Sequence, residues 1–344
     1  MVFFLTACQL YKSSNSACSF SSSFFSSTIV DSSSSLPELA FGNYWRSHLV
    51  EKANDIRNKS VEIGRDGASF VFMTDYHQNT SAKKSPEIIK YLSKEARIDY
   101  TFFGGDITDG VENTSVALDK MKEFSDLWNP VTFLPIRGNH DCEPTANKTI
   151  DQVSNQEYYK LFIKPIQNVI NNDESIYFSL DDNERKTRFI SLDSGSYITE
   201  ALDKRQIEWF QQKLMELDSS WTIVIFQHMV LQTNNDEKTV SLSSYGRITM
   251  EAIDEIFKNI RCNIAAIICG HIHVDAVLET KYNFKIISTT CDSGGANAAY
   301  DWNISERTIG TINECAFDVF LLNTKQRTID SIRVGAGTSR FFAY

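Results

Sequence analysis

Residues 69–77 read Ser-Phe-Val-Phe-Met-Thr-Asp-Tyr-His, a short apolar run that ends in an acid and a histidine. The run from Ser69 to Thr74 predicts a buried strand, because a short continuous apolar segment is typical of a strand covered on both faces. Asp75 and His77 follow this strand directly. In α/β sheets, ligands bind beyond the carboxyl ends of the strands, so this junction is a candidate functional position.

Four more polar segments follow predicted strands further along the chain. They are Gly104–Asp109 (GGDITD), Gly138–Asp141 (GNHD), Gln227-His228 and Gly270–His273 (GHIH). Five of the six histidines of the chain lie in these five segments. Alternation along an extended chain also puts His271 and His273 on the same face, as chelation requires. The clustering predicts that all five segments converge at one edge of a sheet.

Strands alternate with helices along most of the chain. Apolar runs predict strands at residues 69–74, 100–103, 131–136, 175–180, 188–192, 222–226 and 264–269. Helical spacing predicts helices at 44–58, from 85 onward, at 114–128, 204–217 and 250–258, and strand pairs are expected at 276–290 and 316–334. This order indicates an α/β architecture whose sheets are covered by helices. We expect one domain at residues 41–344, because no repeat or second linker interrupts it.

Residues 1–40 differ from the rest. Serine dominates from Ser13 to Ser35, which predicts a disordered linker or a processed segment. Ahead of it, Leu5-Thr6-Ala7-Cys8 resembles the lipobox of bacterial lipoproteins, although only Met1 to Phe4 precede it. The location therefore stays open between a bacterial cytoplasm and an exported, lipid-anchored protein. We expect no transmembrane helix, because no apolar run reaches about 18 residues.

Charge and cysteine content exclude several classes of function. A net charge of −10 argues against an extended nucleic-acid footprint, which needs a basic face. A small phosphorylated substrate remains possible, because bound metal ions would reverse the sign locally. Seven cysteines contain no C-x-x-C pair, so a zinc knuckle is not indicated. A mixed set of Asp, Asn and His side chains suits a pair of divalent ions: manganese, iron, zinc, magnesium or cobalt.

The five segments resemble the calcineurin-like metallophosphoesterases. The pattern of that family is Asp-x-His, Gly-Asp-x-x-Asp, Gly-Asn-His-Asp/Glu, a lone His and Gly-His-x-His, and all five blocks occur here in that order. Residues 44–47 and 333–337 also resemble uncharacterised bacterial and prophage members. The resemblance implies a four-layer α/β/β/α sandwich, in which two mixed β-sheets are flanked by helices.

The resemblance also implies a role for each residue of the pattern. Two divalent metal ions would be bound, the first by Asp75, His77, Asp106 and His273. Asp106 would bridge to the second ion, which would be completed by Asn139, His228 and His271. His140 would contact the phosphate and assist the leaving group, and Asp141 would orient His140 through a hydrogen bond.

The function that these roles imply is hydrolysis of phosphate mono- or diesters by a hydroxide that bridges the two metals. A nuclease or cyclic-nucleotide phosphodiesterase of the same fold is an alternative, and the acidic charge counts against a nuclease. A non-catalytic scaffold with a retained metal site is an alternative from another class. It is disfavoured, because no ligand of the pattern is missing. Substrate identity would depend on loops at 143–156, 233–247 and 292–310, which carry no recognisable pattern.

Two positions in this sequence differ from the patterns of particular subfamilies. Purple acid phosphatases place tyrosine where Asp109 stands, and phosphoprotein phosphatases place Arg-Gly where Gly110-Val111 stands. The sequence therefore favours the broader group of phosphodiesterases and small-molecule phosphatases.

Overall fold

The computed structural model describes residues 43–77, 84–142, 153–171, 173–194, 202–232, 248–292, 307–308 and 310–344. All of these residues belong to one compact unit, residues 41–344. The serine-rich segment and the lipobox-like Cys8 lie outside the described residues. In the part of the chain that the structure describes, no helix combines the length and the apolar character needed to cross a membrane.

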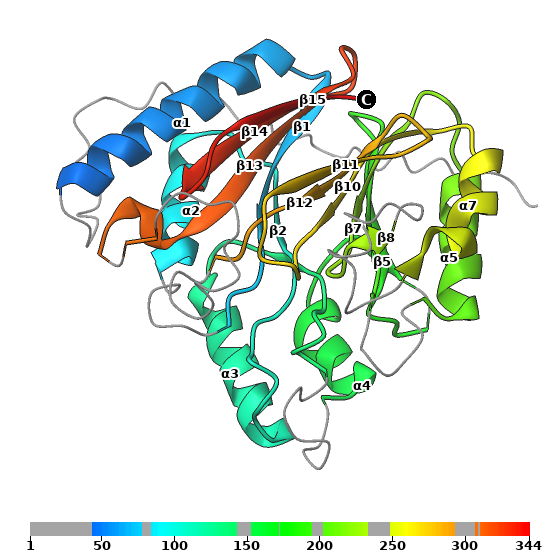
Figure 1. Ribbon diagram of the computed structural model, residues 1–344, viewed down its shortest axis with the longest axis horizontal. Helices are drawn as coiled ribbons and strands as arrows, with labels where there is room; N and C mark the ends of the chain where they lie inside the picture. Colours follow the sequence, from blue (N-terminus) through cyan, green and yellow to red (C-terminus); the bar gives the residue numbers. More distant parts are fainter. Residues whose placement is uncertain are drawn as a thin grey trace, which may run out of the picture. The chain divides into compact units, whose positions relative to one another are not determined.

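Two mixed β-sheets form the centre of this unit (Figure 1). The first has the order β15 (Arg340–Ala343), β14 (Thr328–Gly335), β13 (Ala316–Asn323), β1 (Gly67–Met73), β2 (Tyr100–Phe103), β3 (Leu134–Pro135). The second has the order β11 (Ala276–Glu279), β12 (Lys285–Ser288), β10 (Asn263–Cys269), β7 (Thr222–Phe226), β6 (Thr187–Ser191), β5 (Phe178–Asp182), β4 (Val169–Asn171). A separate two-stranded ribbon joins β8 (Leu231–Gln232) to β9 (Ile248–Thr249).

The central strands of both sheets are parallel. β1 pairs in parallel with β2, and β2 with β3, whereas β13, β14 and β15 add antiparallel strands at one side. In the second sheet β6, β7, β10 and β12 are parallel neighbours, and the edge strands are antiparallel. Parallel strands place their carboxyl ends, and the loops that follow, at the same edge.

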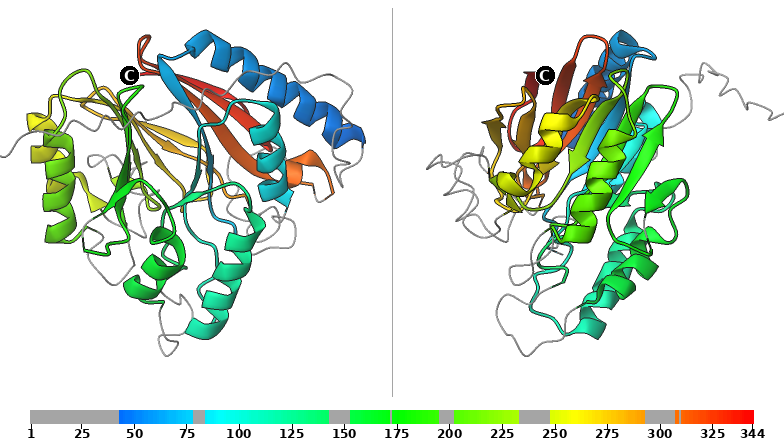
Figure 2. Two further views of the ribbon diagram at one scale, coloured as in Figure 1. Left: turned by 180° about the vertical axis from the view of Figure 1, so that it is seen from behind. Right: turned by 90° about the vertical axis from the view of Figure 1, so that its right-hand side faces the viewer.

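Helices cover the outer faces of the two sheets. α1 (Asn43–Ile63) contacts β1, β13 and β14 and packs beside α2 (Lys84–Glu95). α5 (Lys204–Met215) and α7 (Met250–Asn259) pack together on the second sheet. Figures 1 and 2 show these two helix pairs on opposite sides of the paired sheets. The predicted four-layer α/β/β/α sandwich is confirmed.

The remaining described helices are α3 (Thr114–Leu127) and three shorter ones. The shorter ones are α4 (Asn155–Tyr158), a π-helix that continues α4 (Tyr159–Ile163), and a 3-10 turn (Ile312–Glu314). Asn113 caps α3, because its side chain accepts a hydrogen bond from the Val116 N–H at 3.1 Å.

Phenylalanine rings fill the space between the sheets. The Phe70 ring on β1 lies 5.6 Å from both Phe189 and Phe226, which belong to the opposite sheet. Phe102 stacks on Phe226 at 3.9 Å between ring centroids. Phe70 and Phe72 share a face because side chains alternate along a strand. Burial of these rings supplies a large part of the apolar free energy that holds the two sheets together.

Most of the predicted elements are observed, and several differ in length. The predicted strands at 100–103 and 222–226 match β2 and β7. The helix expected at 44–58 extends to residue 63. The strand expected at 131–136 is confined to Leu134–Pro135, because the Val131 N–H bonds to the Trp128 carbonyl and continues the turn after α3.

We expect Phe226→Ala to lower the free energy of unfolding by about 3–5 kcal/mol, because the fully buried ring contacts both sheets and its loss leaves a cavity. Urea unfolding measures this loss. Phe341→Ala is the control, since that ring is 64% exposed on the edge strand β15, and it should change the value by at most about 0.5 kcal/mol. Equal losses in both variants would contradict the proposed weight of the inter-sheet cluster.

Candidate metal centre

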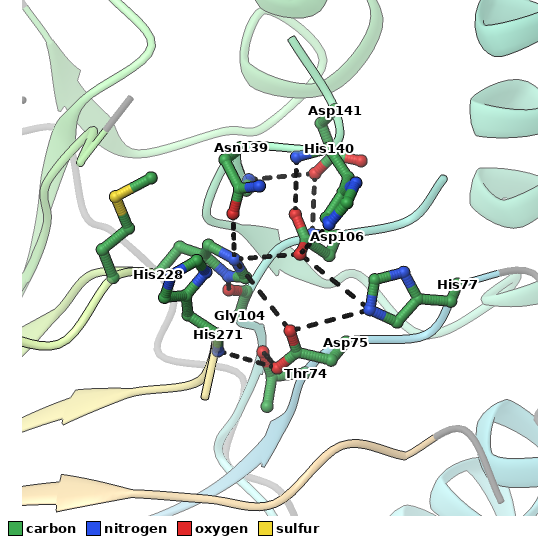
Figure 3. A network of polar contacts seen from close by, with 12 residues as sticks. Thr74, Asp75, His77, Gly104, Asp106, Asn139, His140, Asp141, His228 and His271 are labelled. Carbon is green, nitrogen blue, oxygen red and sulfur yellow. Dashed lines mark hydrogen bonds and ion pairs between the residues drawn. The ribbon is translucent and has the colours of Figure 1, made fainter. Parts of the chain in front are cut away.

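The five polar segments meet at the carboxyl ends of β1, β2, β3, β7 and β10, as Figure 3 shows for most of their side chains. Three of these strands belong to the first sheet and two to the second. The predicted convergence is therefore confirmed, and it brings together residues far apart in the sequence. Two groups of side chains there are close enough to hold a metal ion.

Asp75, His77 and His273 form the first group, and all three are buried. The Nε2 atoms of His77 and His273 lie 3.1 Å apart. His273 Nε2 lies 3.2 Å from Asp75 Oδ1. Two imidazole nitrogens and a carboxylate oxygen that converge in this way match the donor set of a transition-metal ion.

Asp106, His228 and His271 form the second group. His228 Nε2 lies 3.1 Å from Asp106 Oδ2 and 3.1 Å from the Oδ1 atom of Asn139. The same Asp106 oxygen lies 3.9 Å from His77 Nε2 in the first group. Asp106 therefore faces both groups, in the position that a bridging ligand requires (Figure 3).

Backbone carbonyls orient the histidine rings. His228 Nδ1 lies 2.7 Å from the carbonyl oxygen of Gly104, and His77 Nδ1 lies 3.2 Å from that of Thr108. The carboxylate of Asp109 also lies 3.4 Å from His77 Nδ1. A proton on Nδ1 leaves the Nε2 lone pair directed into the site, as metal ligation needs. Carbonyl partners carry no signal in the sequence, which is why sequence analysis missed them.

The carboxylate of Asp75 is held on one side only. Its Oδ2 atom accepts hydrogen bonds from Thr74 Oγ1 at 2.7 Å and from the His271 N–H at 3.0 Å. Among the described residues, the buried Oδ1 atom accepts no hydrogen bond. Nε2 of His273 faces this oxygen at 3.2 Å and Nε2 of His77 at 3.9 Å, and rings protonated on Nδ1 offer it lone pairs and no donor. A metal ion that binds the carboxylate oxygen and both ring nitrogens fits this arrangement.

The backbone at the site is strained. Five site residues other than glycine adopt a positive φ: Asp75 (55°), His77 (47°), Asp106 (59°), His271 (69°) and His273 (54°). Such conformations cost free energy and persist only where surrounding structure holds them, which is common at functional sites.

Glycines allow the loops to approach one another closely. A Cβ atom on Gly138 would lie 2.1 Å from Asp106 Oδ1, and one on Gly270 would lie 2.1 Å from Thr74 Oγ1. Neither contact is tolerable, so both positions require glycine if Asp75 and Asp106 are to keep their places.

The electrostatics of the site favour bound positive charge. Burial raises the pKa of Asp75, but His273 and His228 lower it more, to about 2. Burial lowers the pKa of His228, yet the Asp106 carboxylate raises it to about 9. Burial and the neighbouring His228 lower the pKa of His271 to about 3. The carboxylates thus stay ionised and favour nearby positive charge, which either protonated histidines or metal ions can supply.

His140 is placed differently from the other site histidines. Its side chain is 22% exposed, and its Nδ1 atom lies 2.8 Å from the carbonyl oxygen of Asp109. Its Nε2 atom lies 3.9 Å from Asp106 Oδ2 and is the ring atom that faces the site.

The predicted hydrogen bond from Asp141 to the His140 ring is wrong. One Asp141 oxygen accepts from the Ile107 N–H at 2.7 Å, and the other accepts from the N–H groups of Asp106 and Gly138, each at 2.9 Å. Asp141 is buried beneath the loop after β2, where these backbone donors would otherwise lack a partner. Asp141 therefore fixes the Asp106 loop, and the Asp109 carbonyl takes the role of orienting His140.

A buried acid lies behind the loop that carries Asp75 and His77. Asp292 Oδ1 accepts hydrogen bonds from Ser85 Oγ at 2.7 Å and from the Ala316 N–H at 3.2 Å. Burial raises the pKa of Asp292 to about 7; Glu314 adds to this rise, whereas the two hydrogen bonds and Arg307 oppose it. The folded state therefore favours the neutral acid.

Two other residues weighed from the sequence belong to neither ligand group. His48 is on α1, and Cys142 is buried with its thiol against the carbonyls of Gly138 and Asn139. The loops expected to determine specificity lie largely outside the described residues.

Comparisons with known proteins agree on the family and the fold. A family model for calcineurin-like phosphoesterases matches residues 68–275. A dimetal phosphatase from Danio rerio is similar in structure, with a TM-score of 0.56 and 14% identity, over 80% of this chain and 99% of that chain. A purple acid phosphatase from yellow lupin (Lupinus luteus) seeds has a TM-score of 0.52 and 15% identity, over 80% of this chain and 54% of that chain. No curated protein matches the chain in sequence.

We expect the purified protein to bind close to two metal ions per chain. Asp106→Asn should weaken the binding of both ions, because its Oδ2 atom faces both groups, whereas Asp75→Asn should empty mainly one. Elemental analysis and metal titration measure the outcome. His48→Ala is the control, since this histidine lies on α1, and it should leave metal content unchanged. Protein without metal that is also indifferent to added Mn²⁺ or Zn²⁺ would refute the assignment.

The buried Asp292 predicts a pH dependence of stability. Because its folded pKa is raised above the unfolded value of 3.8, its favourable contribution is complete below pH 4 and is lost as the pH rises to about 7. Asp292→Asn should therefore gain stability over the wild type across this window, by on the order of 4 kcal/mol at about 1.4 kcal/mol per pKa unit. Urea unfolding at pH 4, 5.5 and 7 checks this, and a difference that is constant with pH would contradict it.

Proposed function

Because the chain belongs to the calcineurin-like phosphoesterase family, we propose that it hydrolyses phosphate mono- or diesters with the help of two divalent metal ions. The observation that carries the proposal is the pair of ligand groups at one sheet edge, with Asp106 facing both. All seven predicted ligands converge at this edge, which supports catalysis over a scaffold role.

Seven side chains would hold the ions. Asp75, His77 and His273 would bind one, Asn139, His228 and His271 would bind the other, and Asp106 would contribute to both. When bound, such ions lower the pKa of water and neutralise charge on phosphoryl oxygens. The donor set of nitrogen and oxygen atoms leaves manganese, iron, zinc, magnesium and cobalt as candidates.

His140 is proposed to contact the substrate and not to bind a metal ion. The Asp109 carbonyl accepts a hydrogen bond from Nδ1–H, so a transferable proton on Nε2 belongs to the imidazolium form of the ring, which becomes neutral imidazole when that proton is given up. Partial exposure keeps this atom accessible to an incoming phosphate. In this role the Nε2 proton passes to the oxygen of the leaving group as its bond to phosphorus breaks.

The substrate is proposed to be a small phosphorylated molecule. The net charge of −10 argues against an extended basic face for a long nucleic acid, so we assign the attraction of phosphate to the metal ions. A cyclic-nucleotide phosphodiesterase or a nuclease of the same fold stays an alternative. A screen of monoesters, cyclic nucleotides and single-stranded DNA, repeated with each metal after chelation, separates these activities.

We expect His140→Ala to lower kcat by about 10²–10⁴, because general acid catalysis typically contributes that much. Metal content should stay at the wild-type level, since none of the seven proposed ligands is removed. The defect should be smaller on a nitrophenyl ester, whose leaving group needs little protonation, than on an alkyl phosphate. Steady-state kinetics on both esters test the role. Equal defects, or a lost metal ion, would show that His140 acts in another way.

A further inference from the structure

Two arginines of the C-terminal hairpin β14–β15 reach the loop that carries the last ligand. Arg333 on β14 is 2% exposed, and its fork donates two hydrogen bonds to Asp275, at 2.9 Å to Oδ2 and 2.6 Å to Oδ1. Arg340 on β15 lies 3.6 Å from the same carboxylate. Asp275 follows His273 by two residues, so the fork holds the end of the Gly270–His273 segment.

A buried acid holds the other side of the Arg333 guanidinium. Asp318 on β13 accepts from Arg333 Nε at 3.0 Å and Nη2 at 2.9 Å, and it also accepts from Arg340 at 2.7 Å. Ser331 Oγ donates a further bond to Asp318 at 2.7 Å. Because Asp318 and Arg333 are both enclosed, the guanidinium has a fixed position, and its fork is a rigid support for Asp275.

Thr290 extends this support to His273 itself. Its N–H donates to Asp275 Oδ1 at 3.1 Å, and its hydroxyl donates to the carbonyl oxygen of His273 at 3.0 Å. His273 has a φ of 54°, a conformation that the chain adopts only where neighbours hold it. The Arg333–Asp275–Thr290 chain fixes both the carbonyl of His273 and the turn that follows it.

The hairpin turn is shaped around the same guanidinium. Gly337 has a φ of 103°, and a Cβ atom there would lie 2.5 Å from Arg333 Nη1. The carbonyl of Ala336 accepts a bond from Nη1 at 2.8 Å. The turn thus closes over Arg333 and adds a carbonyl acceptor to its two carboxylate partners, so the guanidinium is held in one position.

We propose that Arg333 is a positioning residue for the metal ligand His273, which it holds through Asp275 and Thr290. The inference rests on the proposed function, since the hairpin can position a metal ligand only if the site binds metal. Among the described residues, the Arg333–Asp275–Thr290 chain ends at His273, a member of the first ligand group, so we expect the main effect at the ion held by Asp75, His77 and His273. The hairpin lies beyond residues 68–275, so the family match does not assign it this role.

Metal titration of the full chain tests the proposal. Metal-free protein is titrated with Mn²⁺, and separately with Co²⁺, by calorimetry. Asp275→Asn should weaken one of the two ions about 10–100-fold, the usual effect of removing a partner that orients a ligand, and leave the other unchanged. Asp275 suits this test because its side chain is 17% exposed and its loss leaves Arg333 paired with Asp318. Arg333→Lys, which keeps the charge and loses the fork, should give a smaller defect at the same ion.

Tyr100→Phe is the control for general destabilisation. It removes the hydrogen bond from the Tyr100 hydroxyl to Asp182 at 2.9 Å, which lies outside the Arg333–Asp275–Thr290 chain and its Asp318 support, so it should lower stability while both metal affinities stay at wild-type values. The weakened ion is identified with His271→Ala, which disables the second ligand group. In that background Asp275→Asn should weaken the one ion that remains.

The outcomes separate this inference from the proposed function. Wild-type protein that binds no metal refutes the function. Wild-type protein that binds two ions, together with an Asp275→Asn variant that binds both equally well, overturns only the positioning role. Equal weakening of both ions in Asp275→Asn, or a matching loss in Tyr100→Phe, also overturns it, because either result indicates general destabilisation.

Discussion

The contact between Asp106 and His228 depends on the packing of the two sheets. Asp106 follows β2 in the first sheet, and His228 follows β7 in the second, yet their side chains approach to 3.1 Å. Only face-to-face packing of the sheets brings these two loops together, and the phenylalanine rings between β1, β2, β6 and β7 set that packing. A core that has no chemistry of its own therefore determines the geometry of the site.

Concentrated negative charge and strained backbone are the costs of this arrangement. Asp75 and Asp106 are buried almost completely, and the loops around them adopt conformations that few residues favour. The surroundings offset these costs with specific support. Asp141 binds the N–H groups of the Asp106 loop, carbonyls orient the rings of His77 and His228, and glycines give the loops room to approach. Each of these contacts is made within the site itself and holds a particular ligand or its loop in place.

Sequence reasoning reached the fold and the grouping of site residues because both depend on local signals. Strand ends followed by Asp, His and Gly occur at short, fixed spacing, and the strand–helix alternation that gives the layers is also local. The supports of the ligands were less accessible. A carbonyl partner is the same in every residue, so nothing in the sequence showed that Gly104 orients His228. The family resemblance implies that Asp141 orients its neighbour His140. The N–H groups that donate to the Asp141 carboxylate come close to it only when the loop has folded. The partnership of Arg333 and Asp275 spans 58 positions and joins a strand of the first sheet to a loop of the second, so it forms only when the two sheets pack.

The distribution of the ligands along the chain has a consequence for biogenesis. His77 and His273 approach within 3.1 Å although 196 positions separate them. A growing chain therefore exposes Asp75 and His77 long before their last partner is synthesised, and the isolated pair is a weak chelator. Strand β13, which pairs with β1, is made later still. The complete set of candidate ligands is therefore assembled only after most of the chain has been synthesised and the two sheets have packed.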